Sequence, residues 1–259
     1  MKNKSIIVKK FCFFLLLQLL LLTWVFSQTG LEIAKQIDEK QKPKDMKTNL
    51  TMVLTNKKGK TRTSTLRSVS KDDSKKQIIW FLAPADDKGV AFLKIEHDGK
   101  DDEMRLWLPA FNKVRRISSK QKADSFMGSD MSYEDMTSRE LEDYTYTLKG
   151  SETIDGIDYY LLESVPHPKL NSEYSKHVAW VSKSDYLVMK EESFDRSGRI
   201  LKVKLIKYKR LKGYDVPEEM YVENVQKNHS TMLTFNNLEL DTNVPDALFQ
   251  EKNLKRLPR

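Results

Sequence analysis

The chain of 259 residues has one cysteine and four histidines, which narrows the chemistry it can perform. Cys12 lies inside an apolar run near the amino terminus, and removal of that run would leave no cysteine. A disulfide, a thiolate nucleophile and a cysteine-ligated metal would then be excluded. His97, His167, His177 and His229 are scattered singly, which favours surface or structural roles.

Sequence motifs of catalysis are also missing. The chain has no Gly-X-Ser-X-Gly elbow, no His-Glu-X-X-His pair, no phosphate-binding loop and no dinucleotide fingerprint. Acidic pairs such as Asp86-Asp87 fall in expected loops, where they would solvate the surface. We therefore predict a protein that is not an enzyme, with no catalytic residue, no metal site and no cofactor. A hydrolase with paired carboxylates is an alternative that residue spacing alone does not test.

The amino-terminal residues 1–27 have the layout of a secretory signal peptide. Four lysines precede an almost unbroken apolar run from Phe11 to Val25, and Val25-Phe26-Ser27 offers residues that a signal peptidase reads. The run of 15 residues is shorter than the roughly 20 needed to span a bilayer. We predict cleavage before Gln28 and export to the periplasm. An uncleaved membrane anchor is the alternative.

The remaining residues 28–259 are weakly basic. Removing four lysines leaves 41 basic and 37 acidic residues, a net charge of +4. Charges of both signs are well mixed, which indicates a solvated surface and argues against a nucleic-acid partner. No internal repeat, linker or second long apolar run occurs. We expect a single domain that is soluble and monomeric and contacts a membrane only transiently.

Alternation of apolar and polar residues predicts a mainly β (α+β) protein. Hairpin turns such as 57–60 and 195–198 separate the strands, and the irregular segment 120–139 interrupts them. Helices are expected after Thr29 and near 246–254. The pattern predicts a single curved antiparallel sheet of roughly 11–12 strands that forms an incomplete β-barrel with a helical lid.

Several predicted strands are apolar on both faces. Ile78 and Trp80 oppose Ile79 and Phe81, and similar pairs occur in the strand at 157–165. A single-layer sheet with one wet face should alternate more cleanly. We expect a concave face that holds a helix, a lid or a ligand.

The stretch 106–117 combines a tryptophan with two arginines. Trp107 and Leu108 end one strand before Pro109, and Arg115 and Arg116 lie on the next. One interpretation is a packed hairpin with exposed basic side chains. The other places an arginine at a cavity rim, where its planar fork would bind an anionic headgroup.

The stretch 126–136 is rich in methionine. Phe126, Met127, Met131, Tyr133 and Met136 surround Gly128 in an expected loop. Methionine adapts its shape and is common at permissive binding surfaces. The stretch is interpreted either as a loop folded over the core or as a mobile lid over acyl chains with Gly128 as hinge.

These two stretches resemble a known family. The matching residues are Trp107-Leu108-Pro109-Ala110, Lys113-Val114-Arg115-Arg116-Ile117 and Gly128-Ser129-Asp130-Met131-Ser132-Tyr133-Glu134-Asp135-Met136. They resemble the outer-membrane lipoprotein-sorting protein family, which is similar to the periplasmic carrier LolA. The resemblance runs from about Leu31 to the carboxyl terminus. It implies a LolA/LolB-like incomplete barrel, an apolar cavity for acyl chains, a diderm host and a lipid-exporting inner-membrane transporter as partner.

We therefore predict a periplasmic carrier that binds acyl chains of lipoproteins or lipids and moves them toward the outer membrane. The candidate ligand-binding residues are Trp80, Phe92, Trp107, Leu108, Arg115, Arg116, Phe126, Met127, Met131, Tyr133, Met136 and Trp180. The main alternative is a periplasmic adaptor that docks on a lipid-exporting pump without carrying lipid. An outer-membrane barrel is disfavoured, because Lys202, Lys204 and Lys207 put lysines on both faces of one strand.

Overall fold

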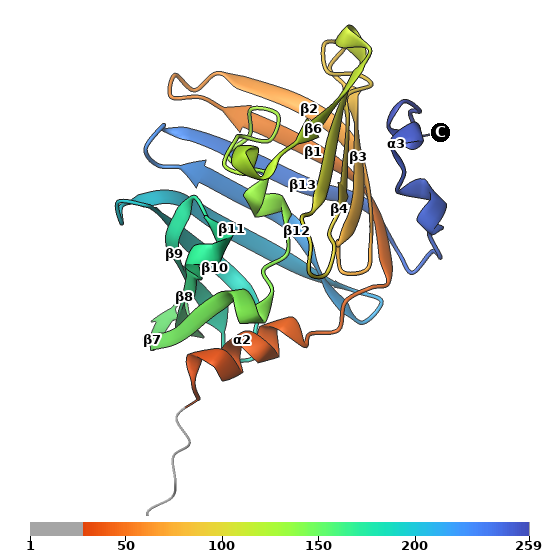
Figure 1. The fold of residues 1–259 in the computed structure, drawn as a ribbon. Coiled ribbons are helices and arrows are strands. Elements are labelled where there is room, and N and C mark those ends of the chain that lie inside the picture. Colours follow the sequence, from red (N-terminus) through yellow and green to blue (C-terminus); the bar gives the residue numbers. More distant parts are fainter. Residues whose placement is uncertain (1–27, 259) are drawn as a thin grey trace, which may run out of the picture.

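The computed structural model describes residues 28–258, so the predicted signal peptide 1–27 lies outside the described residues. Within this range the chain forms a single antiparallel sheet of thirteen strands (Figure 1). None of the helices in residues 28–258 is long and apolar enough to cross a membrane. The predicted mainly β fold is confirmed, with one or two strands more than the sequence indicated.

Two meanders meet in the centre of the sheet. The first runs outward from β1 to the edge strand β6, and the second runs from the other edge strand, β7, back to β13, which pairs with β1. The strands are β1 (Asp45–Thr55), β2 (Thr61–Lys71), β3 (Lys76–Ala83), β4 (Ala91–Ile95), β5 (Glu103–Leu108), β6 (Lys113–Ile117), β7 (Tyr144–Ile154), β8 (Ile157–Pro166), β9 (Tyr174–Ser182), β10 (Val188–Asp195), β11 (Ile200–Leu211), β12 (Tyr214–Asn224) and β13 (His229–Leu240).

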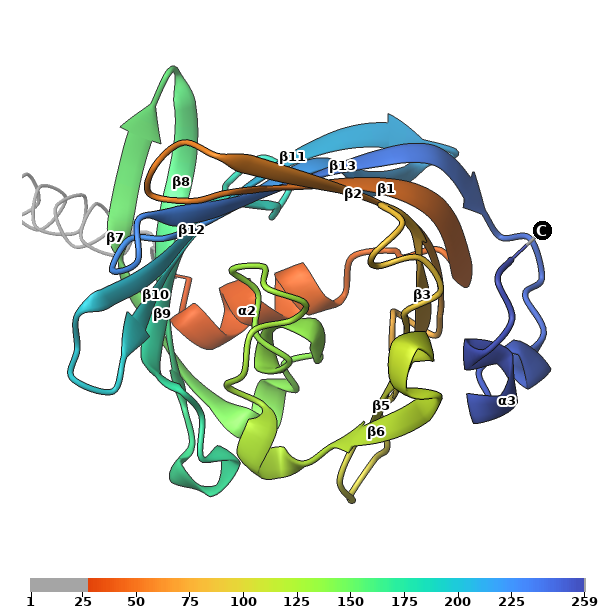
Figure 2. The same cartoon turned by 90° about the horizontal axis from the view of Figure 1, so that it is seen from above.

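The sheet curls but does not close, because β6 and β7 are its two ends (Figure 2). Residues 118–143, here named the crossing segment, lead from β6 to β7 and therefore pass across the open side. The segment contains three 3-10 turns, η2 (Ser119–Gln121), η3 (Glu134–Met136) and η4 (Leu141–Asp143). It is less helical than the predicted lid.

Local polar contacts explain why the crossing segment forms turns instead of a regular helix. The Ser129 hydroxyl donates to the Phe126 carbonyl, and Asp135 accepts from the backbone N–H of Ser132. Such side-chain bonds compete with helical hydrogen bonds. Met127 and Gly128 both have positive φ, at 50° and 78°, which belongs to a turn. The predicted hinge motion at Gly128 stays a prediction.

Helix α2 (Gly30–Asp38) packs inside the curve of the sheet (Figure 2). The predicted start is confirmed, because Thr29 and Glu32 form a capping box in which each side chain accepts from the other residue's backbone N–H. Ile33 and Ala34 pack against β8 and β9. Gly30 lies so close to β7 that an added Cβ would be 2.7 Å from the backbone of Thr147. The helix thus fills one end of the concave face.

The convex face of β3 to β5 is covered as well. The carboxyl-terminal segment, which contains η6 (Asp246–Leu248) and α3 (Glu251–Leu254), closes over an apolar cluster that includes Trp80 and Trp107. A further 3-10 turn, η1 (Pro109–Phe111), forms the β5–β6 turn. The Trp80 indole N–H donates to the Asn253 carbonyl at 3.2 Å. These strands are apolar on both faces because the concave core lies on one side and this segment on the other.

The cover on the convex face gives a stability prediction. Leu254 is 1% exposed, whereas Leu257 on the same segment is 40% exposed. Leu254→Ala should lower the free energy of unfolding by about 2–5 kcal/mol, since it leaves a cavity over Trp80. Leu257→Ala is the matched control and should change stability little. Urea denaturation of both variants checks this, and equal losses would contradict the packing described.

Candidate ligand-binding cavity

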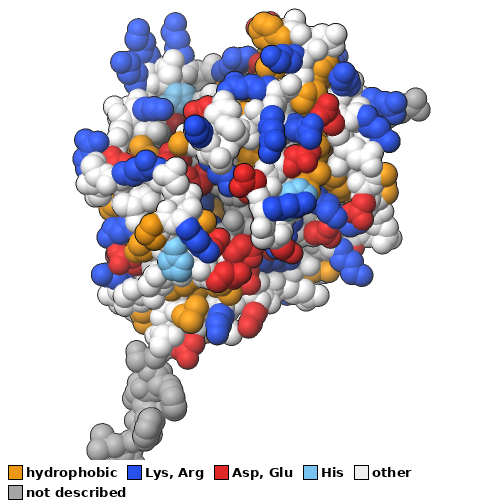
Figure 3. Space-filling view, in the orientation of Figure 1, with side chains coloured by type: hydrophobic (Ala, Val, Ile, Leu, Met, Phe, Trp, Pro, Cys, Tyr) orange, Lys and Arg blue, Asp and Glu red, His pale blue; other side chains and the backbone are white. Residues whose placement is uncertain are grey.

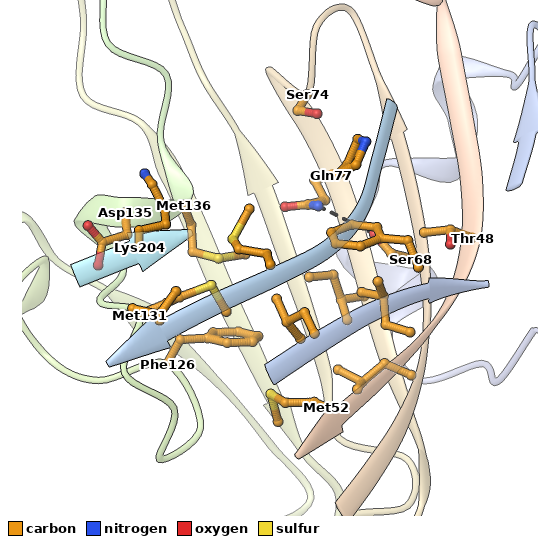
Figure 4. Close-up of a pocket in the computed structure, with 18 of the residues that line it drawn as sticks. Thr48, Met52, Ser68, Ser74, Gln77, Phe126, Met131, Asp135, Met136 and Lys204 are labelled. Atoms are coloured by element: carbon orange, nitrogen blue, oxygen red, sulfur yellow. Dashed lines mark hydrogen bonds between the residues drawn. The ribbon is translucent and has the colours of Figure 1, made fainter. Parts of the chain in front are cut away.

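A cavity of about 290 Å³ lies on the concave face beneath the crossing segment (Figure 4). Its volume is at the lower end of small-molecule sites, which hold about 300–1,000 Å³. The walls come from β1 to β4, from β10 to β13 and from the crossing segment. The lining residues are Met46, Thr48, Leu50, Met52, Leu66, Ser68, Ser74, Gln77, Ile79, Lys94, Phe126, Met131, Asp135, Met136, Glu191, Ser193, Lys202, Lys204, Pro217, Met220, Val222, Leu233 and Phe235.

Most of the cavity wall is apolar. Alternate residues of β1 point inward because side chains alternate between the faces of a strand, which places Leu50 and Met52 on the wall. β12 and β13 add Met220 and Leu233, and the crossing segment adds Met131 from the opposite side. Figure 4 shows Met131 and Phe126 of the crossing segment on one side of the cavity and Met52 of β1 on the other. Flexible methionines on two sides suit a ligand of variable shape.

One side of the cavity is charged. The Lys202 ammonium lies 2.7 Å from a carboxylate oxygen of Asp135 and donates to the Tyr174 hydroxyl at 2.6 Å, while that hydroxyl donates to Asp135 at 2.8 Å. Burial alone would raise the pKa of Asp135, but the Lys202 charge and hydrogen bonds from Lys202 and Ser132 lower this pKa to about 2. The contact joins the crossing segment to β9 and β11.

A second buried ion pair lies on the same side. Arg139 of the crossing segment holds Glu191 of β10 through two contacts, of 2.5 and 3.0 Å. Lys204 lies 2.8 Å from the same carboxylate. Burial opposes the charge on Glu191, but Arg139 and Lys204 keep its pKa well below the usual range. This forked geometry fixes where the crossing segment meets β10.

His177 completes this cluster as a neutral group. Its Nδ1 lies 3.3 Å from an Arg139 nitrogen, which can only donate, and 2.8 Å from the Ser193 hydroxyl. Nδ1 is therefore an acceptor and the ring proton sits on Nε2. Burial, followed by the Arg139 charge, lowers the pKa of His177 to about 3. The expected structural role of this histidine agrees with its position.

The crossing segment is also tied to the other half of the sheet. Lys94 of β4 donates to the Met136 carbonyl at 2.6 Å, and Glu96 accepts from the Ser138 N–H at 3.0 Å. Asp130 contacts β13, where its backbone N–H donates to the Thr231 hydroxyl at 2.9 Å. The segment therefore bridges the two halves through polar contacts while its apolar side chains form the cavity roof.

The structure brings together most of the residues predicted in the methionine-rich stretch. Phe126, Met131 and Met136 line the cavity. Four further predicted residues, two from this stretch and two from the strands, pack in the adjoining apolar cluster, where the Phe92 and Phe126 rings lie 5.2 Å apart. These further members are Met127, Tyr133, Phe92 and Leu108.

Three predicted tryptophans lie elsewhere, which corrects their expected position. Trp80 and Trp107 lie on the convex face under the carboxyl-terminal segment. Trp180 is half-buried on the outer side of β9, where its indole N–H donates to Glu152 and Lys190 lies over its ring. Side chains alternate between the two faces of a strand, so Trp80 points outward because its neighbour Phe81 points inward.

The two arginines of the first stretch are separated by the same alternation. Arg115 is half-exposed, with a nitrogen 4.0 Å from the Asp124 carboxylate of the crossing segment. Arg116 is exposed and pairs in register with Arg105 of β5. Neither lines the cavity.

Several cavity residues were missed from the sequence. Met46, Leu50 and Met52 of β1 line the cavity but were not among the predicted ligand-binding residues. Lys202 and Lys204 were noted only as lysines of a two-faced strand and were not predicted at the site, yet both line the cavity and Lys202 is 7% exposed. A lysine is usually exposed, so only its partners, Asp135 and Glu191, reveal its position.

The Asp135–Lys202 pair gives a pH-dependent prediction. A carboxylate with a folded pKa of about 2, below the usual value near 3.9, stabilises the fold fully above about pH 4. That contribution is lost as the pH falls through about 2. The stability difference between the wild type and Asp135→Asn should therefore shrink by about 2 kcal/mol from pH 6 to about pH 2.

Chemical denaturation across this pH range measures the difference. Glu142→Gln is the matched control, because Glu142 is an exposed carboxylate of the same segment. Its difference from the wild type should stay small throughout. A gap between Asp135→Asn and the wild type that is the same at every pH would contradict the ion pair.

Solved structures with the same fold cover nearly the whole described chain. An outer membrane lipoprotein-sorting protein domain from Vibrio parahaemolyticus is 34% identical, with a TM-score of 0.82, over 88% of this chain and 98% of its own. A DUF1329 family protein from Desulfovibrio piger is 32% identical, also with a TM-score of 0.82, over 87% and 97%. A LolA superfamily protein from Nitrosomonas europaea is 21% identical, with a TM-score of 0.70, over 86% and 98%, and shows the fold alone.

A family model described as an uncharacterized protein matches residues 73–256, which include the cavity roof and most of the sheet. No curated protein matches the chain. The Vibrio domain supports the resemblance of the Trp107 and Met131 stretches, since the similarity spans both chains almost completely. The chain therefore belongs to the outer-membrane lipoprotein-sorting protein family and has the LolA-like fold.

Proposed function

We propose that the protein is a periplasmic carrier that holds an acyl chain of a lipoprotein or lipid in the cavity and moves it toward the outer membrane. The observation that carries this proposal is the largely apolar cavity of about 290 Å³ inside an open sheet, roofed by the crossing segment. Family membership adds support, because the Vibrio relative is described as a lipoprotein-sorting domain.

The apolar wall is enough to hold a chain reversibly. Burial of each methylene contributes about 0.8 kcal/mol. Ten methylenes would contribute about 8 kcal/mol, which corresponds to a dissociation constant near 1 μM before the cost of association. A carrier needs this range, because it must also release its cargo. No covalent or catalytic group is required.

The roof is suited to opening because polar contacts position it. The crossing segment meets the sheet through Asp135, Arg139 and the backbone at Met136 and Ser138. Such contacts are exchanged for water when the segment moves. The apolar wall residues of the strands stay on the sheet, whereas Phe126, Met131 and Met136 move with the segment. Entry and release of cargo then follow displacement of the roof.

Delivery also requires contact with a membrane, and the β5–β6 turn supplies a candidate surface. Phe111 at this turn is 76% exposed, and Lys113 follows it. The hairpin projects at one end of the molecule (Figure 1). Elsewhere on the face shown in Figure 3, basic and acidic side chains are mixed, and hydrophobic side chains form only small patches. An exposed aromatic ring beside a basic residue suits an anionic lipid surface.

Removal of this ring should weaken membrane contact. Phe111→Ser should reduce binding to vesicles containing anionic phospholipid roughly tenfold, because insertion of the ring contributes on the order of 1.4 kcal/mol. Leu257→Ser, at an exposed apolar position outside this turn, is the control and should bind like the wild type. Co-sedimentation measures both. Equal binding by all three proteins would remove the turn from the proposal.

Filling the cavity should reduce acyl binding. Met220→Trp adds a ring to the wall and should exclude two or three methylenes, so affinity for a fluorescent fatty acid should fall roughly 15- to 60-fold. Leu205→Trp is the matched control, because Leu205 is 43% exposed and precedes Ile206, the register partner of Met220. It should bind with wild-type affinity.

Titration of delipidated protein by fluorescence gives both affinities. Circular dichroism and thermal melting establish that each variant is folded. If the wild type binds no acyl probe, or if Met220→Trp binds as tightly as the wild type, the carrier proposal fails for this cavity. Capture of an inner-membrane partner by lipid-free protein would instead favour the adaptor.

A further inference from the structure

A second cavity lies next to the first, between α2 and β8 to β11. Its volume is about 320 Å³, similar to that of the first. Its wall includes Ala34 and Ile37 of α2, Leu162 of β8, Ala179 of β9 and Val188 of β10. Apolar groups make up most of its surface, and the charged lining includes Lys40, Lys42 and Asp215.

The two cavities meet at one ion pair. Glu191 lines both cavities, and Arg139 lines the second. The forked contact between these side chains therefore lies at the boundary. Arg139 comes from the crossing segment, whereas Glu191 belongs to the sheet, so the boundary is formed by groups from two separate parts of the fold.

We propose that the second cavity takes the distal part of an acyl chain that is too long for the first, and that the Arg139–Glu191 pair is the gate between them. This inference rests on the proposed function and names its ligand class more closely, as a long acyl chain. Opening the gate would roughly double the apolar space.

The surroundings of Glu191 make such opening feasible. Lys204 is the cross-strand neighbour of Glu191 and lies 2.8 Å from its carboxylate. The carboxylate thus keeps a cation when Arg139 leaves. The Arg139 side chain is 30% exposed, so it already reaches toward water. Departure of Arg139 therefore leaves no buried charge without a partner.

Chain length should determine whether the gate opens. Each further buried methylene raises affinity about fourfold. A short chain is accommodated in the first cavity and leaves the ion pair intact. A longer chain gains affinity only by passing Glu191 into the space beside α2, and this gain offsets separation of the pair.

Photolabelling tests the path directly. Fatty acids of 10 and 16 carbons, each with a diazirine at the terminal carbon, are bound to the delipidated protein and irradiated, and labelled residues are identified by mass spectrometry. The 10-carbon probe should label residues of the first cavity, such as Met52 and Met220. The 16-carbon probe should label residues of the second, such as Leu162 and Tyr186.

Two kinds of variant report on the gate. Arg139→Gln should raise the fraction of 16-carbon label in the second cavity at least threefold, whereas the 10-carbon label should stay in the first cavity. Val188→Trp narrows the second cavity and should move the 16-carbon label out of it. Ile37→Phe narrows it from α2 and replaces Val188→Trp if that variant does not fold.

The outcomes separate this inference from the proposed function. If both probes label only the first cavity, in the wild type and in Arg139→Gln, the second cavity is not part of the path and the inference is overturned. If neither probe gives labelling that unlabelled decanoate competes away, the proposed function fails with it. Unchanged 16-carbon labelling in both narrowed variants also overturns the inference.

Discussion

The structure depends on one constraint: the edge strands β6 and β7 do not pair, yet the chain must pass from one to the other. The crossing segment therefore has to span the open side of the curved sheet. Its apolar side chains, including Phe126 and Met131, face the concave surface and roof a cavity. An open edge and a covering segment thus arise together from the connectivity.

The crossing segment is attached by a buried apolar cluster around Phe126 and Tyr133 and by ion pairs nearer its carboxyl-terminal end. Asp135 and Arg139 meet partners on β11 and β10, and both contacts are mostly shielded from water. Buried ion pairs fix geometry more than they add stability, because desolvation offsets much of their attraction. Lys204 beside Glu191 gives that carboxylate a second cation. The roof is accordingly well positioned in the closed state and separable from the sheet without stranding a charge.

Periodicity predicted the curved sheet, the capped helix after Thr29 and the irregular crossing segment, since these depend on local patterns. It could not say which face of a strand is concave, so Trp80 and Trp107 were placed at the ligand although they pack under α3. Lys202 gave no sign of burial, because its partner Asp135 is distant in sequence. Inward residues of β1 and β12 become a cavity only when the sheet curls.

Native mass spectrometry of the chain from residue 28 onward, purified from the periplasm of a bacterial host, tests the central claim most directly. The carrier account predicts reproducible adducts with the mass of an acyl-bearing lipid, released when the protein is denatured. The adducts should be displaced by added fatty acid, because both occupy the same apolar cavity. Protein that is consistently free of lipid, and that remains so after incubation with phospholipid vesicles, would contradict the account.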